Sequence, residues 1–291
     1  MIRKSIALLF SGFLLISSCT KNEVKTIEGN TPPPDNTIPS SLQVGFINKA
    51  YISILGREPD TDEYNSAKSV LDQAEFSESS RKEVVNQILT NDEFYDREFE
   101  IYRNDLLNST DTIQITDLIN TFEFLLTSPA YEAQWPLIEV ELTRLQALRD
   151  VPTGLKNGTV SLKEMQRRCI DNNFFDQINM GSLNFVLAVF QHLLLRNPTE
   201  FELSEGVKIV DGFNGILFLQ IAQSKIEFEN IFFNSDAYYE GQVKLNFYRF
   251  LLRMPNSEET AYYTNMLKAN SDYKSFLAEI LSGDEYAGLT N

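Results

Sequence analysis

Side chains suited to nucleophilic or metal chemistry are scarce in this chain. His192 is the single histidine, and it lies in the helix-like stretch Phe190–Leu195. One histidine excludes histidine-rich metal clusters and the usual zinc sites, and it cannot be assigned as a general base without a nucleophile beside it. Cys169 precedes an aromatic-rich segment, where a cysteine is expected to be a small buried side chain. We therefore predict no catalytic residue, no metal site and no cofactor.

Short motifs of hydrolytic and calcium sites give no positive signal. Ser79–Lys82 and Ser271–Lys274 both read Ser-x-x-Lys, but each lies where a helix is expected to start and lacks the companion motifs of such enzymes. Asp60-Thr61-Asp62 begins like a calcium loop, yet Tyr64 and Asn65 stand where a ligand and a glycine are needed. The 41 acidic residues will place some carboxylate pair at glycosidase spacing by chance, so an envelope hydrolase remains a second alternative function.

The first 19 residues have the pattern of a lipoprotein signal. Two cations at positions 3 and 4 precede the apolar run Ile6–Ile16, and small residues lead to Cys19 in Ser17-Ser18-Cys19. The apolar run is shorter than the roughly 20 residues that a membrane span needs. The pattern resembles the signal of Gram-negative lipoproteins, which implies removal of residues 1–18 and acylation of Cys19. Since Thr20 leaves no aspartate at the second mature position, we expect an outer-membrane anchor, on the periplasmic or the cell-surface face.

Charge and cysteine content narrow the possible partners. The formal net charge is -16, and loss of the signal would remove two more cations. Such an acidic body repels phosphate backbones and anionic headgroups, which disfavours nucleic-acid binding and leaves the acyl chains on Cys19 as the membrane contact. With Cys19 lipidated, Cys169 has no intrachain disulfide partner. Residues 19–42 are rich in Pro, Thr and Asn and are predicted to be a flexible tether.

One local pattern occurs three times, in Tyr51–Asp60, Phe190–Thr199 and Phe247–Asn256. In each copy an aromatic residue and a leucine four positions later share one helical face, which predicts a buried face. An arginine follows two positions after the leucine and is expected in the last helical turn, where a cation is favourable. A proline two positions later cannot continue the helix. These residues are Arg57 and Pro59, Arg196 and Pro198, and Arg253 and Pro255.

A capping box follows each proline. The first residue after the proline has a side-chain oxygen, and a glutamate stands three residues further on, which is the spacing that satisfies two free amides at a helix start. The pairs are Asp60 with Glu63, Thr199 with Glu202, and Asn256 with Glu259. The pattern therefore predicts a tight corner between two helices at each of the three places.

A second recurring phrase, a polar pair followed by an aromatic residue, is expected to close the units. It occurs at residues 89–94, 126–131, 233–238 and 281–286, and more weakly at 170–174. The single short strand-like alternation is Asp111–Ile115. Within it, Asp111-Thr112-Ile113 resembles an O-glycosylation sequon of some Gram-negative envelope proteins. We predict an all-α array of four or five helix-turn-helix units behind the signal and tether, with N-terminal repeats over residues 43–136 and C-terminal repeats over 137–291.

The first unit resembles a known family. Phe46–Asp60, together with Leu89–Phe94, resembles the bacterial helical repeat of unknown function marked by Y-x-x-x-L-G-R-x-P-D and a closing S-x-E-F, which is similar in turn to the phycobilisome linker domain. The resemblance covers residues 44–95 well and 183–289 more loosely. In the later copies Leu195 and Leu252 replace Gly56, and the Gly-x-x-Tyr-Trp that often follows is missing. The family has no established catalytic residues, so the resemblance implies a helical module used for contact.

Paired tyrosines are the candidate binding residues. Neighbouring rings on a helix cannot both face one core, so one ring of each pair is expected at the surface. The candidates are Tyr238, Tyr239, Tyr262 and Tyr263. We predict a lipid-anchored, non-enzymatic protein-interaction or scaffold module of the cell envelope, with glycan or peptidoglycan binding through these tyrosines as the main alternative. A groove with a row of tyrosines would favour glycans, two facing carboxyls would favour hydrolysis, and an apolar strip would favour a protein partner.

Overall fold

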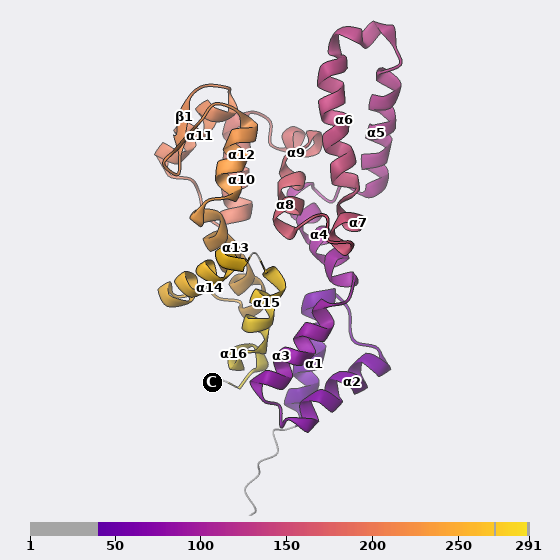
Figure 1. Cartoon of the computed structure of the whole chain (residues 1–291), viewed down its shortest axis with the longest axis vertical. Coiled ribbons are helices and arrows are strands. Elements are labelled where there is room, and N and C mark those ends of the chain that lie inside the picture. Colours follow the sequence, from indigo (N-terminus) through magenta and orange to yellow (C-terminus); the bar gives the residue numbers. More distant parts are fainter. Residues whose placement is uncertain (1–39, 271, 290–291) are drawn as a thin grey trace, which may run out of the picture. The chain divides into compact units, whose positions relative to one another are not determined.

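The computed structural model describes residues 40–270 and 272–289. Cys19, the signal sequence and the tether as far as Pro39 lie outside the described residues. The part of the chain that the structure describes belongs to one compact unit with sixteen α-helices, one 3₁₀ helix and one two-stranded sheet (Figure 1). The prediction of an all-α fold is confirmed.

The helices follow one another through short turns. In chain order they are α1 (Ser40–Leu55), α2 (Thr61–Gln73), α3 (Glu78–Leu89), α4 (Glu93–Leu106), α5 (Thr112–Leu125), the 3₁₀ helix η1 (Pro129–Gln134), α6 (Trp135–Arg149), α7 (Val151–Lys156), α8 (Leu162–Ile170), α9 (Asn173–Ile178), α10 (Ser182–Leu194), α11 (Glu200–Val210), α12 (Lys225–Phe233), α13 (Asp236–Leu251), α14 (Ser257–Asn270), α15 (Tyr273–Ser282) and α16 (Asp284–Ala287). Strands β1 (Gly215–Leu217) and β2 (Gln220–Ala222) form an antiparallel hairpin between α11 and α12.

All three predicted corners are present, and each capping box forms. The glutamate amide donates to the cap side chain at 2.8 Å for Asp60, 3.2 Å for Thr199 and 2.9 Å for Asn256. In return each glutamate carboxylate accepts the cap's own N–H, at 2.7 to 2.8 Å. Two free amides at the start of α2, α11 and α14 are thereby satisfied, which fixes where these helices begin.

The expected place of the arginines was wrong. Helices α1, α10 and α13 end two residues before Arg57, Arg196 and Arg253 rather than at them. The reason is the residue in between, which adopts a left-handed conformation with φ of 80° at Gly56, 54° at Leu195 and 56° at Leu252. A left-handed residue stops an α-helix. Each arginine therefore lies in the corner itself, where its side chain can reach the next helix.

The first helix begins earlier than the tether prediction allowed. Ser40, Ser41 and Leu42 are helical, so the last three residues of the predicted tether belong to α1. Leu42 is half-buried, and its Cδ2 lies 4.0 Å from where a Cβ on Gly288 would stand. Helix α1 therefore passes close to α16 and Gly288 at the C-terminal end of the described residues.

The one strand-like alternation in the sequence, Asp111–Ile115, is helical, and the two strands lie in another segment. Asp111 is the N-cap of α5 and forms a capping box with Gln114, so Asp111–Ile115 starts a helix. The actual hairpin turns at Phe218 and Leu219, whose φ values of 48° and 66° are those of a type I′ turn. Such turns normally carry Asn-Gly or Asp-Gly, so the sequence held no turn signal here.

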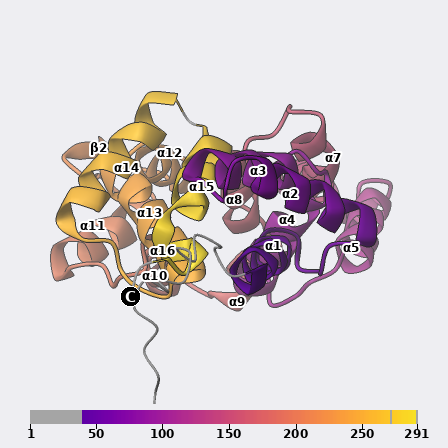
Figure 2. The ribbon, with the colours of Figure 1, turned by 90° about the horizontal axis from the view of Figure 1, so that it is seen from below.

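Two hydrophobic cores hold the described residues together. One is built mainly from α4 to α13 with the hairpin, and the other from α1 to α3 with α13, α15 and α16. Helix α3 packs along α15, although about 190 residues separate them in the sequence (Figure 2). Both cores draw residues from either side of position 136, where the sequence suggested a boundary between N-terminal and C-terminal repeats. None of the helices in residues 40–270 and 272–289 is both long and apolar enough to cross a membrane.

Candidate functional site

The repeated arginines are held by carboxylates in the corners. The guanidinium of Arg57 donates two hydrogen bonds to Glu63, at 2.7 and 2.8 Å, and two more to Glu93, also at 2.7 and 2.8 Å. Arg253 makes the same double pairing with Glu259 and Glu285, at 2.6 to 2.8 Å. Bidentate pairing fixes the orientation of both partners. The corners at Arg57 and Arg253 are thus each held by two carboxylates.

Glu93 and Glu285 explain the closing phrase that the sequence showed. Glu93 stands directly before Phe94 and accepts hydrogen bonds from Arg57, 36 residues earlier in the chain. Glu285 stands directly before Tyr286 and accepts hydrogen bonds from Arg253, 32 residues earlier. In the middle unit this position is Ala237, and Arg196 pairs with Glu202 alone. Sequence reasoning assigned the phrase only a buried aromatic and missed the glutamate, because no local spacing rule connects it to the arginine.

These carboxylates are structural. Hydrogen bonds from the arginine guanidinium lower the pKa of Glu63, Glu202 and Glu259 below the usual value, so the three stay ionised and paired. A carboxylate engaged in this way is a poor general acid. The repeat-motif residues therefore form the corners of the fold and do not assemble a reaction site.

The four candidate tyrosines do not form one row. Tyr238 is 3% exposed, and its hydroxyl donates to Gln166 Oε1 at 2.7 Å, so it faces the core. Tyr239 is half-buried. Tyr262 is 59% exposed, whereas its neighbour Tyr263 packs against the ring of Phe247, with centroids 5.4 Å apart. The expected division into an inner and an outer ring holds clearly for Tyr262 and Tyr263.

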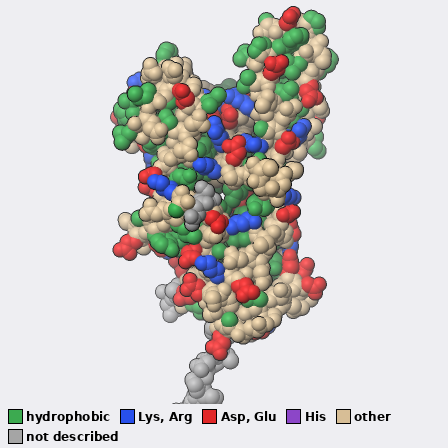
Figure 3. All heavy atoms as spheres, in the orientation of Figure 1, with side chains coloured by type: hydrophobic (Ala, Val, Ile, Leu, Met, Phe, Trp, Pro, Cys, Tyr) green, Lys and Arg blue, Asp and Glu red, His purple; other side chains and the backbone are tan. Residues whose placement is uncertain are grey.

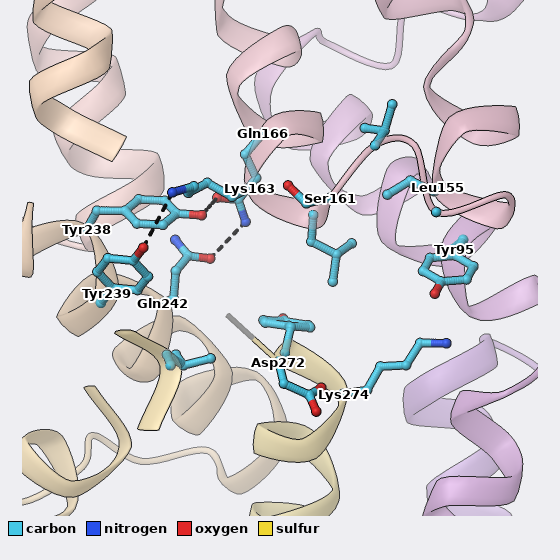
Figure 4. Close-up of a pocket in the computed structure, with 15 residues that line it drawn as sticks. Tyr95, Leu155, Ser161, Lys163, Gln166, Tyr238, Tyr239, Gln242, Asp272 and Lys274 are labelled. Carbon is cyan, nitrogen blue, oxygen red and sulfur yellow. Dashed lines mark hydrogen bonds between the residues drawn. The ribbon is translucent and has the colours of Figure 1, made fainter. Parts of the chain in front are cut away.

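Tyr238 and Tyr239 line a pocket of about 380 Å³ between α4, α8, α13 and α15 (Figure 4). Its floor is a closed hydrogen-bond network: Gln166 accepts from Tyr238 and donates to Gln242 Oε1 at 2.8 Å. Gln242 in turn donates to the Leu193 carbonyl at 3.3 Å. Tyr262 and Tyr263 are not among the lining residues. The pocket was not predicted, because its walls come from four separate segments.

The other candidate chemical groups lie apart from one another. Cys169 is fully buried, as predicted, and burial raises the pKa of its thiol to about 12, so it stays protonated at neutral pH. His192 is exposed on α10 and lines a second pocket with Asp105. Each of these two pockets is lined by a single carboxyl residue, Asp272 in the first and Asp105 in the second. Within the described residues no group of three His, Cys, Asp or Glu side chains is arranged to hold a metal ion.

Several large apolar side chains are exposed on the helical arm formed by α5, η1 and α6, whose two α-helices pack on each other. None of residues 120–144 is buried, although the segment contains three Phe or Trp residues and several large aliphatic ones. Phe124 is 69% exposed and Leu137 is 72% exposed. At the tip of the arm the start of α6 is joined to the end of α5, because the Trp135 ring N–H donates a hydrogen bond to the Leu125 carbonyl at 3.2 Å. Hydrophobic side chains gather at this tip in Figure 3, at the upper right.

Comparison with protein-family models, with curated proteins and with solved structures found no match to this chain. The resemblance of Phe46–Asp60 to the bacterial helical repeat therefore stays a prediction.

Proposed function

We propose that this chain is a lipid-anchored protein of the bacterial cell envelope, tethered through Cys19, whose helical body acts as a non-enzymatic protein-interaction module. The anchor rests on the signal pattern that ends at Cys19. The interaction role rests on one observation, the exposed large side chains of the arm segment 120–144, which are Phe124, Tyr131, Leu137 and Val140. Large exposed apolar patches are uncommon on monomers and mark contact surfaces.

The charge of the arm indicates what kind of partner fits it. Between Arg103 and Arg144 the sequence has seven acidic residues and no lysine or arginine. Residues 104–143 therefore combine apolar side chains with acidic charges alone, which favours a partner with an apolar groove and a basic rim. The same charge disfavours an anionic bilayer or a nucleic acid as the partner.

The β-hairpin offers a second contact surface. Leu219 is 98% exposed at the turn, with Ile221 and Phe213 exposed beside it. A left-handed leucine costs roughly 1–2 kcal/mol, and a strained, exposed apolar residue is a candidate for function. Leu252 is also left-handed and 83% exposed, but it lies in the corner between α13 and α14. It is therefore a matched control for Leu219.

The interaction role is tested by cross-linked affinity capture of the tagged full chain from envelopes. Phe124→Ser and Leu137→Ser should lower recovery of a specific partner at least roughly tenfold, since interface anchors typically contribute about 2 kcal/mol or more. Ile52→Ser, which removes an exposed apolar side chain from α1, should leave recovery unchanged. By the same measure, Leu219→Gly should lower recovery of the partner, whereas the control Leu252→Gly should leave recovery unchanged. The proposal fails if folded arm and hairpin variants retain every partner while a change at His192 or a carboxylate removes a hydrolytic activity.

The anchor is tested separately. Cys19→Ser removes the thiol that would be acylated, so the variant should lose metabolic labelling by a fatty acid and leave the membrane fraction. A variant that still sediments with membranes after a high-salt wash would show that something other than a lipid on Cys19 holds the protein there.

A further inference from the structure

The base of the arm carries a buried group of charged side chains. We propose that Glu229 on α12 acts there as a proton-controlled switch for the arm. Protonated Glu229 leaves Arg144 on α6 paired with Asp171 at the end of α8, which holds the arm against the body. Ionised Glu229 competes with Asp171 for Arg144 and loosens the arm at its base. The switch regulates the contact surface proposed above, so its use rests on that proposed function.

The arm joins the rest of the fold mainly through α6. Helix α5 packs on α6, and α6 in turn contacts α7 and α8. Helix α8 lies between α6 and α12 (Figure 1). Polar contacts join α6 to α8, since Arg144 Nε lies 3.1 Å from Asp171 Oδ1 and Arg168 Nη1 donates to the Ala147 carbonyl at 2.9 Å. A change of partner at Arg144 therefore acts directly on the attachment of the arm, while the Arg168 contact remains.

Three carboxylates share two guanidinium groups at this place. Arg144 Nη1 donates to Glu141 Oε1 at 2.7 Å, and Arg167 Nε lies 3.5 Å from Glu229 Oε2. Each carboxylate also has at least one buried oxygen without a hydrogen-bond partner among the described residues, and in Glu229 both oxygens lack one. A buried carboxylate without a partner is costly while it is charged. Such a carboxyl therefore either keeps a proton or takes a cation from a neighbour.

Glu229 is the carboxyl that keeps the proton, because it is fully buried. Burial first, and then the nearby Asp171, raises the pKa of Glu229 to about 8. The charged groups that face it are Asp171 and Arg167 on α8, Arg144 on α6 and Lys225 on α12 itself. Lys225 is already paired with Asp176 of α9 at 2.6 Å, so an ionised Glu229 attracts a guanidinium instead. This exchange of partners is the charge change that biases the arm.

The test is a distance measurement by pulsed electron paramagnetic resonance on the full chain. Spin labels at Ala133→Cys, at the exposed tip of the arm, and at Ser69→Cys, on the exposed face of α2, report the position of the arm. Cys19→Ser removes the other thiol expected to react, since Cys169 is fully buried. One distance population is expected at pH 6, and a second should replace it with a midpoint near pH 8.

Three substitutions separate the switch from general effects of pH. Glu229→Gln cannot ionise and should keep the low-pH population at pH 9. Arg144→Gln removes the cation that joins α6 to Asp171, so the second population should be present at both pH values. Glu139→Gln, the same change as at Glu229 but on the exposed face of α6, should keep the full pH response. Circular dichroism at both pH values checks that each variant is folded.

The proposal is overturned if the distance does not change between pH 6 and pH 9, if the change is accompanied by loss of helical signal, or if Glu229→Gln responds as the original protein does. Loss of the response in Glu139→Gln would overturn it as well. Should Arg144→Gln not fold, the two glutamate variants still decide. No partner is present in this measurement, so its failure leaves the capture experiment with Phe124→Ser and Leu137→Ser standing, and a failed capture leaves the switch measurable.

Discussion

Glu229 on α12 gives the sharpest test of the buried electrostatics. Its side chain is fully buried, and neither carboxylate oxygen has a hydrogen-bond partner among the described residues. The nearest cation is Arg167, whose Nε lies 3.5 Å from Oε2. Burial first, and then the charge of Asp171, raises the pKa of Glu229 to about 8, against the opposing influence of Lys225, Arg167 and other cations. A carboxylic acid that stays protonated at neutral pH is therefore built into the core.

The sign of the pH dependence follows from this shift. The pKa of Glu229 is raised from 4.5 in the unfolded chain to about 8 in the folded one. The folded state therefore keeps a proton that the unfolded state releases as the pH rises from 4.5 to 8. The stabilisation is fully present below pH 4.5 and is lost as the pH rises through 8. At about 1.4 kcal/mol per pKa unit the loss is on the order of 2–5 kcal/mol.

Glu229→Gln removes the ionisation and nearly keeps the shape. At pH 5 the variant should unfold within about 1 kcal/mol of the original protein, and at pH 9 it should be more stable by on the order of 2–5 kcal/mol, as measured by urea denaturation. Glu98→Gln is the contrast, because Glu98 is buried but accepts a 2.6 Å hydrogen bond from Arg249; it should destabilise the fold at both pH values. Equal pH dependence in the original protein and in Glu229→Gln would refute the reasoning.

Four further substitutions test the packing and the corners by denaturation. Leu252→Gly relieves an exposed left-handed leucine and should raise the free energy of unfolding by about 0.5 kcal/mol, whereas a decrease would mean that the side chain packs in solution. Gly241→Ala should lower it by roughly 1–3 kcal/mol, because the added Cβ would stand 2.4 Å from the Leu193 carbonyl oxygen and push α10 and α13 apart. Arg253→Gln should lower the free energy of unfolding more than Arg196→Gln, because it leaves two carboxylates without their cation, whereas Arg196→Gln leaves one. Equal losses would show that the second glutamate contributes nothing.

What the sequence could and could not predict follows from the range of each interaction. The capping boxes at Asp60, Thr199 and Asn256 were predictable because both partners lie within three residues of each other. The clamp on Arg57 was not, because Glu93 lies 36 residues away and its spacing has no periodic meaning. The available signal was that a glutamate stands directly before the closing aromatic in both the first and the last copy of the phrase, at Glu93 and Glu285.

The pocket was beyond sequence reasoning for the same reason. Lys163 and Lys274 look like ordinary surface cations in the sequence, and only the packing of α8 near α13 and α15 makes them line the same pocket. The hairpin was missed because Phe218 and Leu219 form a turn that usually needs Asn-Gly. The ring of Phe218 packs near those of Phe190 and Phe232, which favours this turn, whereas Leu219 is 98% exposed and gains no packing from it.

The pairing of α3 with α15 dictates an order of events during synthesis. Arg81 on α3 is almost fully buried, and its guanidinium donates to the Ser282 carbonyl at 2.7 Å and to Asp284 at 2.5 Å, more than 200 residues later in the chain. While the chain is being made, the face of α3 that packs on α15 stays uncovered until α15 has emerged. A chain that stopped after α13 would expose that face and leave a buried cation without its partners. Helix α3 therefore completes its packing only after α15 has been made, and proteolysis or truncation that removes α15 should first destabilise α3 and the helices that pack on it.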